Sequence, residues 1–276
     1  MEGRARQIVF LHSMWRARST WLFGRFRESG RYRCYYEPLN EALATLDASA
    51  LGEDARARGD LRHPPLAGGY WQAYRTLLPA SGIGVEGFEE RFAFHRFGPE
   101  NDPGPYFDRL IDRSPRSSVL FKLNRSAYRI AWFTARHPRA RHFFLERDPR
   151  DQFRSYRVDP AYFLPMQLVL AWLQPPLREK MRRRFPDLAP SRFERMGGLG
   201  RGEATSRLRR FFRKRLERSD EEHRWAIFEF LHVEAGREAR SAGAAIVDVD
   251  DHAAIETAFG PLLSGPGADR RACAVR

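Results

Sequence analysis

Cysteine is scarce in this chain of 276 residues, which holds only Cys34 and Cys273. Two cysteines provide neither a disulfide framework nor a cysteine-rich metal cluster, and such scarcity is typical of a reducing compartment. Long apolar runs are also missing: residues 162–173 form the longest, and Pro165 and Gln167 interrupt it. Because a bilayer-spanning helix needs about 20 apolar residues, we expect no integral membrane segment. The apolar stretch after the first six residues is too short for a signal peptide, so we expect a cytoplasmic protein.

Lysine is nearly absent as well. The chain has 48 basic and 35 acidic residues, a net charge of +13, yet only Lys122, Lys180 and Lys214 are lysines and the rest are arginines. Such a skew is typical of a biased genome composition, so the charge alone is weak evidence for nucleic-acid binding, and we expect no nucleic-acid partner. The planar fork of arginine suits phosphate and sulfate. The composition therefore favours a small anionic ligand.

Five short apolar runs have the length and composition of β-strands. Helical patterns at 20–28, 127–135, 149–156 and most of 161–239 alternate with them, and 41–48 and 70–78 also look helical. Alternation of nearly continuous apolar strands with helices predicts a parallel sheet covered on both faces. We therefore expect a three-layer α/β fold with a central, mainly parallel sheet of about five strands. The predicted strands are 7–12, 32–36, 119–123, 141–147 and 244–249.

The domain organisation follows from the same pattern. We expect one α/β domain over residues 1–265, because the strands are spread from one end of this range to the other. Segments 41–113 and 161–239 would be insertions, the second mostly helical, and 266–276 a flexible tail. In parallel sheets ligands bind at the carboxyl ends of the strands. The residues that follow each strand are therefore the candidates for function.

The loop after the first strand has the composition of an anion site. It reads Ser-Met-Trp-Arg-Ala-Arg-Ser-Thr-Trp-Leu from Ser13 to Leu22, and Ser19 is predicted to cap the helix that follows. A strand, a short turn and a helix start present backbone N–H groups, hydroxyls and the positive end of a helix dipole to an anion. The loop has no Gly-x4-Gly-Lys-Ser/Thr pattern, which weakens the case for ATP or GTP hydrolysis. An ordinary helix cap is the alternative interpretation.

A second motif follows the fourth strand. Arg147-Asp-Pro-Arg-Asp places an arginine at the strand end, and Ser155 follows on the next helix if Pro149 opens that helix. The hydroxyl and the guanidinium would then lie close enough to share one phosphate. A surface network of arginines and aspartates is the alternative interpretation.

Together the two loops resemble those of the sulfotransferases that use 3′-phosphoadenosine 5′-phosphosulfate (PAPS). The first is similar to their 5′-phosphosulfate loop: Arg16 takes the basic position, Ser19 and Thr20 the hydroxyl pair, and Trp21 the helix start. Trp15, Ala17 and Arg18 replace the usual proline, serine and glycine. If the glycine position needs a positive φ, the side chain of Arg18 costs on the order of 1 kcal/mol. The second motif matches the family's 3′-phosphate motif without a departure, and Tyr36-Glu-Pro after the second strand resembles a further family sequence.

The resemblance implies a fold like that of P-loop kinases and a set of residue roles. The donor would be PAPS, released as adenosine 3′,5′-bisphosphate, and Arg147 with Ser155 would bind the 3′-phosphate. Glu37 would take the acceptor proton, with His12 as the alternative base, and Arg16 and Lys122 would stabilise the leaving phosphate and the sulfuryl oxygens. The donor-binding residues implied by the resemblance are Arg16, Ala17, Arg18, Ser19, Thr20, Trp21, Arg147 and Ser155.

The acceptor is not encoded in any motif. A hydroxyl or amine of a small molecule or carbohydrate fits the resemblance, and Asn124 and Arg125 are candidates to touch either substrate. Histidines show no ligand spacing with cysteines or acids, so we expect no metal. A kinase or other nucleotide-dependent transferase is the second interpretation, and a basic nucleic-acid-binding protein the third. The sequence leaves open the oligomeric state, the adenine contacts and the choice between Glu37 and His12.

Overall fold

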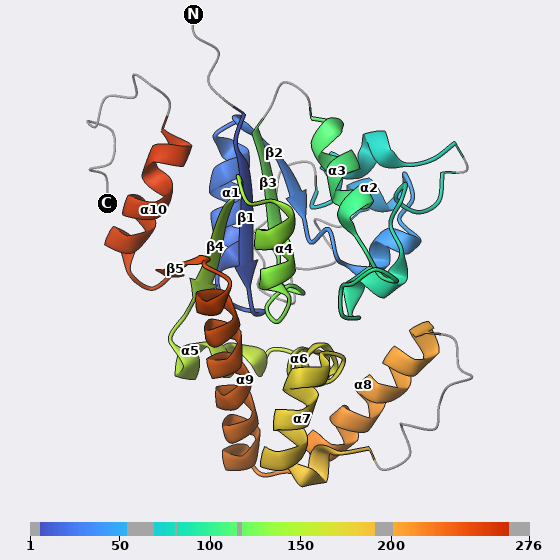
Figure 1. Cartoon of the computed structure of the whole chain (residues 1–276), viewed down its shortest axis with the longest axis vertical. Helices are drawn as coiled ribbons and strands as arrows, with labels where there is room; N and C mark the ends of the chain where they lie inside the picture. The colour runs from blue at the N-terminus through green and yellow to red at the C-terminus, as the bar shows by residue number, and fades with distance from the viewer. Residues whose placement is uncertain (1–5, 54–68, 81, 115–117, 191–200, 265–276) are drawn as a thin grey trace, which may run out of the picture.

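A five-stranded, all-parallel sheet forms the centre of the computed structural model, which describes residues 6–53, 69–80, 82–114, 118–190 and 201–264 (Figure 1). The strands lie in the order β2-β3-β1-β4-β5. Their bounds are β1 Ile8–Ser13, β2 Tyr32–Tyr36, β3 Ser118–Leu123, β4 Arg141–Glu146 and β5 Ala245–Asp248. Each agrees with its predicted run to within two residues at either end. The α/β class and the parallel sheet are confirmed.

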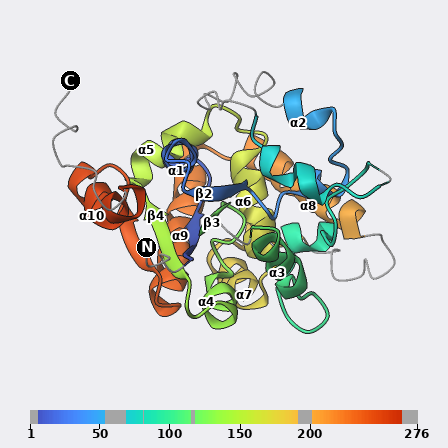
Figure 2. The same cartoon turned by 90° about the horizontal axis from the view of Figure 1, so that it is seen from above.

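Helices cover both faces of the sheet, so the fold has three layers (Figure 2). One face packs against α1, where Phe23 meets Tyr36 edge-on, and against α10, where Phe259 meets Phe143. The other face packs against α3, α4 and α9. The helices are α1 Ser19–Glu28, α2 Ala50–Glu53, α3 Gly104–Asp112, α4 Ile130–Arg136, α5 Pro149–Tyr156, α6 Phe163–Trp172, α7 Pro175–Arg184, α8 Arg201–Glu217, α9 Glu221–Ser241 and α10 His252–Leu263.

The register of the strands sets which side chains face which layer. Tyr35, Phe121, Phe10 and His142 are paired across four strands, and their rings stack in a row on the α3–α4 face. Since successive side chains alternate between faces, the next row turns to the α1 face and includes Lys122. The two faces are therefore buried by different residues, as the continuous apolar strands predict.

The segment 161–239 is largely helical where it is described, as predicted. Helices α6, α7, α8 and the first turns of α9 form a body beside the carboxyl end of the sheet (Figure 1). Their packing centres on α6, whose residues are all buried. No helix of the described residues is long and apolar enough to cross a membrane.

Several local predictions need correction. Ser19 is the first residue of α1 rather than its cap, because Arg18 takes the N-cap position in a left-handed conformation and no side chain caps the helix. Residues 41–48 and 70–78 form short 3-10 helices, Glu41–Ala44 and Gln72–Leu77, instead of α-helices. The predicted tail 266–276 lies outside the described residues, and the single-domain interpretation stays a prediction.

Candidate functional site

The ends of all five parallel strands carry polar residues that meet at one edge of the sheet. Ser13 ends β1, Glu37 follows β2, Asn124 follows β3, Arg147 follows β4, and Asp250 comes shortly after β5. Parallel strands bring their carboxyl ends to the same edge, which is why residues so far apart in the sequence can form one site.

A cavity of about 160 Å³ lies at this edge, between the loop after β1 and the segment from Arg147 to Ser155. It is lined by seven of the eight residues predicted to bind the donor. Ala17, the eighth, is fully buried in the loop. Trp15, Asn124 and Phe163 complete the lining. The seven predicted residues are Arg16, Arg18, Ser19, Thr20, Trp21, Arg147 and Ser155.

Direct contacts join the two predicted motifs. Arg16 Nε donates to Ser155 Oγ at 2.9 Å, and its guanidinium lies 5.5 Å from the centre of the Phe163 ring. Arg147 Nη1 donates to the carbonyl oxygen of Arg16 at 3.2 Å. Gln152, on α5 and buried, donates to the carbonyl oxygen of Trp15 at 2.7 Å. The loop after β1 is therefore held against α5 and the residue that follows β4 by three hydrogen bonds, each from a different side chain.

The start of α1 adds backbone donors to the cavity. Ser19 and Thr20 occupy the first two positions of the helix, where N–H groups have no intrahelical acceptor. Arg16 and Arg18 both have positive φ, 65° and 51°. Two left-handed residues in a tight loop before a helix turn backbone N–H groups toward one point, the geometry of an anion-binding concavity. The arrangement suits a phosphate or sulfate group.

Asp250 provides a carboxylate beside two of these cations. Its Oδ1 lies 3.1 Å from Arg18 Nη1 and 3.8 Å from Arg147 Nε, and its Oδ2 accepts from the amide of Asp148 at 3.1 Å. The Nε of Arg147 is buried and makes no hydrogen bond. Two guanidinium groups of the predicted anion site thus share one carboxylate.

Glu37 lies in a buried ion-pair network next to the cavity. Its carboxylate is 2.5 Å from Lys122 Nζ and 3.5 Å from Arg125 Nη1, and it accepts from the amide of Asn124. Glu37 and Lys122 are both almost wholly buried. Asn124 connects the network to the cavity, because its side-chain oxygen accepts from Ser19 Oγ at 3.1 Å. The structure therefore brings Lys122 to Glu37, whereas the cavity lining does not include Lys122.

Arg125 is the other cation of this network. Burial acts to lower the pKa of its guanidinium, but the electrostatic effects of Glu41, Tyr162 and Glu37 together outweigh burial and raise the pKa. Its Nη2 donates to Glu41 at 2.6 Å, and the guanidinium stacks over Trp15 at 5.4 Å. Arg125 therefore stays charged, and it connects the Glu37 carboxylate to the indole that lines the cavity.

His12 does not reach the cavity. Its side chain is fully buried on the α4 face, where Nδ1 is 2.8 Å from Ser126 Oγ and Nε2 is 3.3 Å from His142 Nδ1. Burial and the neighbouring His142 lower its pKa well below the usual value. The alternation of side chains along β1 explains the outcome, because His12 shares a face with Phe10 rather than with the loop.

Backbone strain is concentrated at the site. Among the described residues, only three other than glycine have positive φ, namely Arg16, Arg18 and Glu37. Such conformations cost about 1–3 kcal/mol each and persist where surrounding contacts enforce them. The amide of Glu37 donates to the carbonyl of Lys122 at 2.9 Å, and this bond holds the strained residue against the end of β3. All three belong to the set that sequence motifs selected.

Comparisons of the chain with known protein families, characterised proteins and solved structures find no match. The interpretation of the site consequently depends on its own residues and geometry.

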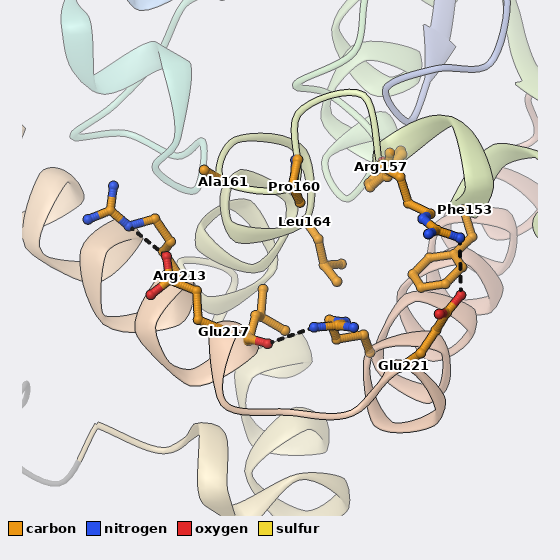
Figure 3. A pocket seen from close by; sticks show the side chains of 11 residues that line it. Phe153, Arg157, Pro160, Ala161, Leu164, Arg213, Glu217 and Glu221 are labelled. Carbon is orange, nitrogen blue, oxygen red and sulfur yellow. Dashed lines mark hydrogen bonds and ion pairs between the residues drawn. The ribbon is translucent and has the colours of Figure 1, made fainter.

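A larger cavity of about 550 Å³ lies among α5, α6, α8 and α9 (Figure 3). Phe153 and Leu164 contribute to its apolar lining, and the ion pairs Arg213–Glu217 and Arg157–Glu221 lie on two sides of it. None of the predicted site residues lines it. It does fall partly within the segment 161–239, which the sequence predicts to be a mostly helical insertion. Among the described residues, no cluster of three or more histidine, cysteine or acidic side chains could hold a metal ion.

Sequence reasoning missed Asp250 and Phe163. The signal for Asp250 is its place shortly after the last strand, but its neighbours depend on β5 pairing with β4. Phe163 begins α6, and its role depends on the turn that brings this helix back to Arg16. Neither follows from local sequence.

Proposed function

We propose that the protein is a sulfotransferase that moves the sulfuryl group of PAPS to a hydroxyl or amine of a small-molecule or carbohydrate acceptor. The observation that carries the proposal is the convergence of Arg147 and Ser155 with Ser19 and Thr20 around one cavity. A site for this donor needs two anion-binding positions about one ribose apart, one for the 5′-phosphosulfate and one for the 3′-phosphate. The loop after β1 supplies one position, and Arg147 before α5 together with Ser155 near the end of α5 supplies the other.

The two anion-binding positions use different hydrogen-bond donors. The 5′-phosphosulfate would accept hydrogen bonds from the backbone amides at Ser19 and Thr20, reinforced by the dipole of α1. The 3′-phosphate would accept from the Arg147 guanidinium, whose Nε has no hydrogen-bond partner, and from the Ser155 hydroxyl. Since Ser155 Oγ already accepts from Arg16, its hydrogen can be donated to the phosphate.

The size of the cavity agrees with this division. A volume of about 160 Å³ suits phosphate-sized groups, whereas whole drug-sized ligands occupy cavities of roughly 300–1,000 Å³. The adenosine would therefore extend over the rim, where the Trp21 indole is 40% exposed. An exposed aromatic face there can stack on a purine base.

The transfer itself would be an in-line displacement. The bond from sulfur to the 5′-phosphate oxygen breaks as the bond from sulfur to the acceptor oxygen or nitrogen forms, and a base removes the acceptor proton. Glu37 is the proposed base, in which role a carboxylate contributes roughly 10²–10⁴-fold to the rate. Lys122 and Arg125 would orient the carboxylate toward the acceptor. Arg16, at the cavity, would stabilise charge on the leaving phosphate.

A kinase or another nucleotide-dependent transferase is the second candidate. The phosphate-binding loop and the parallel sheet are compatible with it. Two features favour PAPS instead. The sequence 13–22 has no lysine of the kind that nucleotide-hydrolysing loops use, and the pair of Arg147 and Ser155 lines the cavity.

Ligand-induced stabilisation tests the proposal. Adenosine 3′,5′-bisphosphate at about 100 times its Kd adds about 2.7 kcal/mol to the free energy of unfolding, a rise in Tm of about 5–10 °C. AMP and ATP, which lack the 3′-phosphate, should shift Tm far less at the same concentration. Equal shifts for all three nucleotides would contradict the assignment.

Two arginine substitutions test whether Arg147 binds the 3′-phosphate. Arg147→Ala should weaken binding of the bisphosphate by about 1.5–3 kcal/mol, the range for a hydrogen bond to a charged group. Arg154→Ala is the matched control, since this arginine lies on α5 with a largely exposed side chain and pairs only with Asp151 among the interactions described. Its affinity should equal that of the wild type.

A further inference from the structure

Asp250 occupies a position that a bound phosphate would contest. The carboxylate faces Arg18 on one side and Arg147 on the other, at 3.1 and 3.8 Å. Arg147 is one of the two residues proposed to bind the 3′-phosphate, and its side chain is only 15% exposed. A phosphate that approaches this guanidinium therefore meets an anion already in place.

Arg18 has a conformation that needs an explanation. Its φ of 51° costs an L-residue on the order of 1 kcal/mol, whereas glycine would adopt it freely. The side chain is half exposed, lines the cavity and points its guanidinium at the same carboxylate as Arg147. An arginine at this strained position places a second cation beside the proposed 3′-phosphate site, which a glycine cannot do.

We propose that Arg18 and Arg147 form a two-guanidinium clamp for the ribose 3′-phosphate, and that Asp250 is its internal counterion, displaced when the phosphate binds. The inference depends on the proposed function, because it names the ligand group that the clamp holds. Before the ligand binds, the Asp250 carboxylate offsets the repulsion between the two guanidinium groups. A ligand must compete with this carboxylate, so only a strongly charged group binds there. A 3′-phosphate displaces the carboxylate, whereas a 3′-hydroxyl does not.

The hydrogen bonds that hold Asp250 in place, here called its tether, are compatible with such a displacement. Its Oδ2 accepts from the amide of Asp148, and its own amide donates to Asp248 Oδ1 at 2.8 Å. Only Oδ1 faces the two arginines. Rotation of the carboxylate about this tether would free both guanidinium groups without a change in the backbone.

Asp250→Asn tests the counterion role, because asparagine keeps the shape and one oxygen acceptor but removes the charge. Calorimetry should find adenosine 3′,5′-bisphosphate bound about 5- to 10-fold more tightly than by the wild type, the scale of one partly exposed charge at this distance. The affinity for AMP should change less than about 2-fold. Asp108→Asn is the matched control: it removes one negative charge from an exposed pair on α3 and should change neither affinity.

Arg18→Gly tests the clamp. It should weaken binding of the bisphosphate but not of AMP, and in the double variant with Asp250→Asn the gain from the asparagine should shrink, because half of the clamp is gone. Thermal unfolding of each variant shows whether it is folded before its affinity is compared.

The outcomes separate the two claims. If Asp250→Asn leaves the affinity for the bisphosphate unchanged, the counterion role is wrong. If it lowers the affinity, the counterion role is wrong and Asp250 instead orients Arg147. If it tightens AMP and the bisphosphate equally, the carboxylate acts on the 5′ end and the clamp is wrong. If the wild type itself does not prefer the bisphosphate to AMP, the proposed function fails first.

Discussion

At the scale of single residues, Glu37 combines three features that rarely occur together in a surface loop: burial, positive φ and two cationic partners. A carboxylate held this way is costly to desolvate, and buried Lys122 loses its counterion if the charge of Glu37 is removed. Such an arrangement is expected where the charge itself has a function. The carboxylate also accepts a hydrogen bond from the amide of Asn124, a residue that lines the cavity.

Glu37→Gln should therefore separate folding, binding and turnover. The free energy of unfolding should fall by about 3 kcal/mol, because Lys122 is left buried without its counterion. Binding of adenosine 3′,5′-bisphosphate should persist, and sulfuryl transfer should slow by roughly 10²–10⁴-fold. Transfer of labelled sulfate to the acceptor, measured with saturating donor, gives the turnover.

Glu41→Gln is the control for that variant. Glu41 binds the same Arg125 at 2.6 Å, but its side chain is about one-third exposed and does not contact Lys122 in the interactions described. Its substitution should disturb the network while leaving transfer near the wild-type rate. If Glu37→Gln also transfers at that rate, the proton acceptor is another group.

At the scale of elements, each strand ends in a site residue or is followed by one within two residues. The start of α5 follows capping rules that the sequence shows. Pro149 opens α5, and Asp148 caps it by accepting from the amide of Asp151 at 2.9 Å. This start places Ser155 on the side of α5 that faces the loop after β1. The Arg147–Ser155 spacing thus has a structural cause in the geometry of one strand end and one helix.

The His12–His142–His137 cluster predicts a pH dependence that belongs to the β1–β4–α4 contact. Burial lowers the pKa of all three histidines, that of His137 to about 4. Below about pH 6.5 these histidines bind protons in the unfolded chain but not in the folded chain. Their contribution to the free energy of unfolding is therefore complete above that pH and is lost as the pH falls below it. Each histidine contributes about 1.4 kcal/mol per pH unit within its window.

Urea unfolding between pH 7.5 and 5.0 measures this slope. In His12→Phe, the slope below pH 6.5 should be shallower by about 1.4 kcal/mol per pH unit, whatever the effect of the substitution on stability at neutral pH. His252→Asn, which changes an exposed histidine on α10, should keep the wild-type slope. An unchanged slope in His12→Phe would show that this residue is not the buried neutral group.

At the scale of the whole molecule, the sequence predicts the sheet well and the site in part. The strands are found because apolar β-forming runs such as Val119–Leu120–Phe121 are buried on both faces. The segment 70–78 is less regular than predicted, because its aromatic residues, among them Tyr74, pack against β2 irrespective of helical period. The local pattern therefore predicts the strands but not the 3-10 helices within 41–48 and 70–78.

The site shows the same limit. Motifs locate Arg147, Ser155 and the loop after β1, because each motif lies within a few residues of one strand end. The contact of Asp250 with Arg18 depends on the sheet order, in which β5 lies beside β4, and no local pattern encodes that order. The buried position of Lys122 against Glu37 likewise depends on the pairing of β2 with β3.

A structure of the protein with adenosine 3′,5′-bisphosphate bound tests the central claim most directly. The 3′-phosphate should lie within hydrogen-bond distance of the Arg147 guanidinium and Ser155 Oγ, with the 5′-phosphate at the amides of Ser19 and Thr20. A nucleotide bound with its 3′-phosphate in solvent, or in a cavity that Arg147 and Ser155 do not line, would contradict the account.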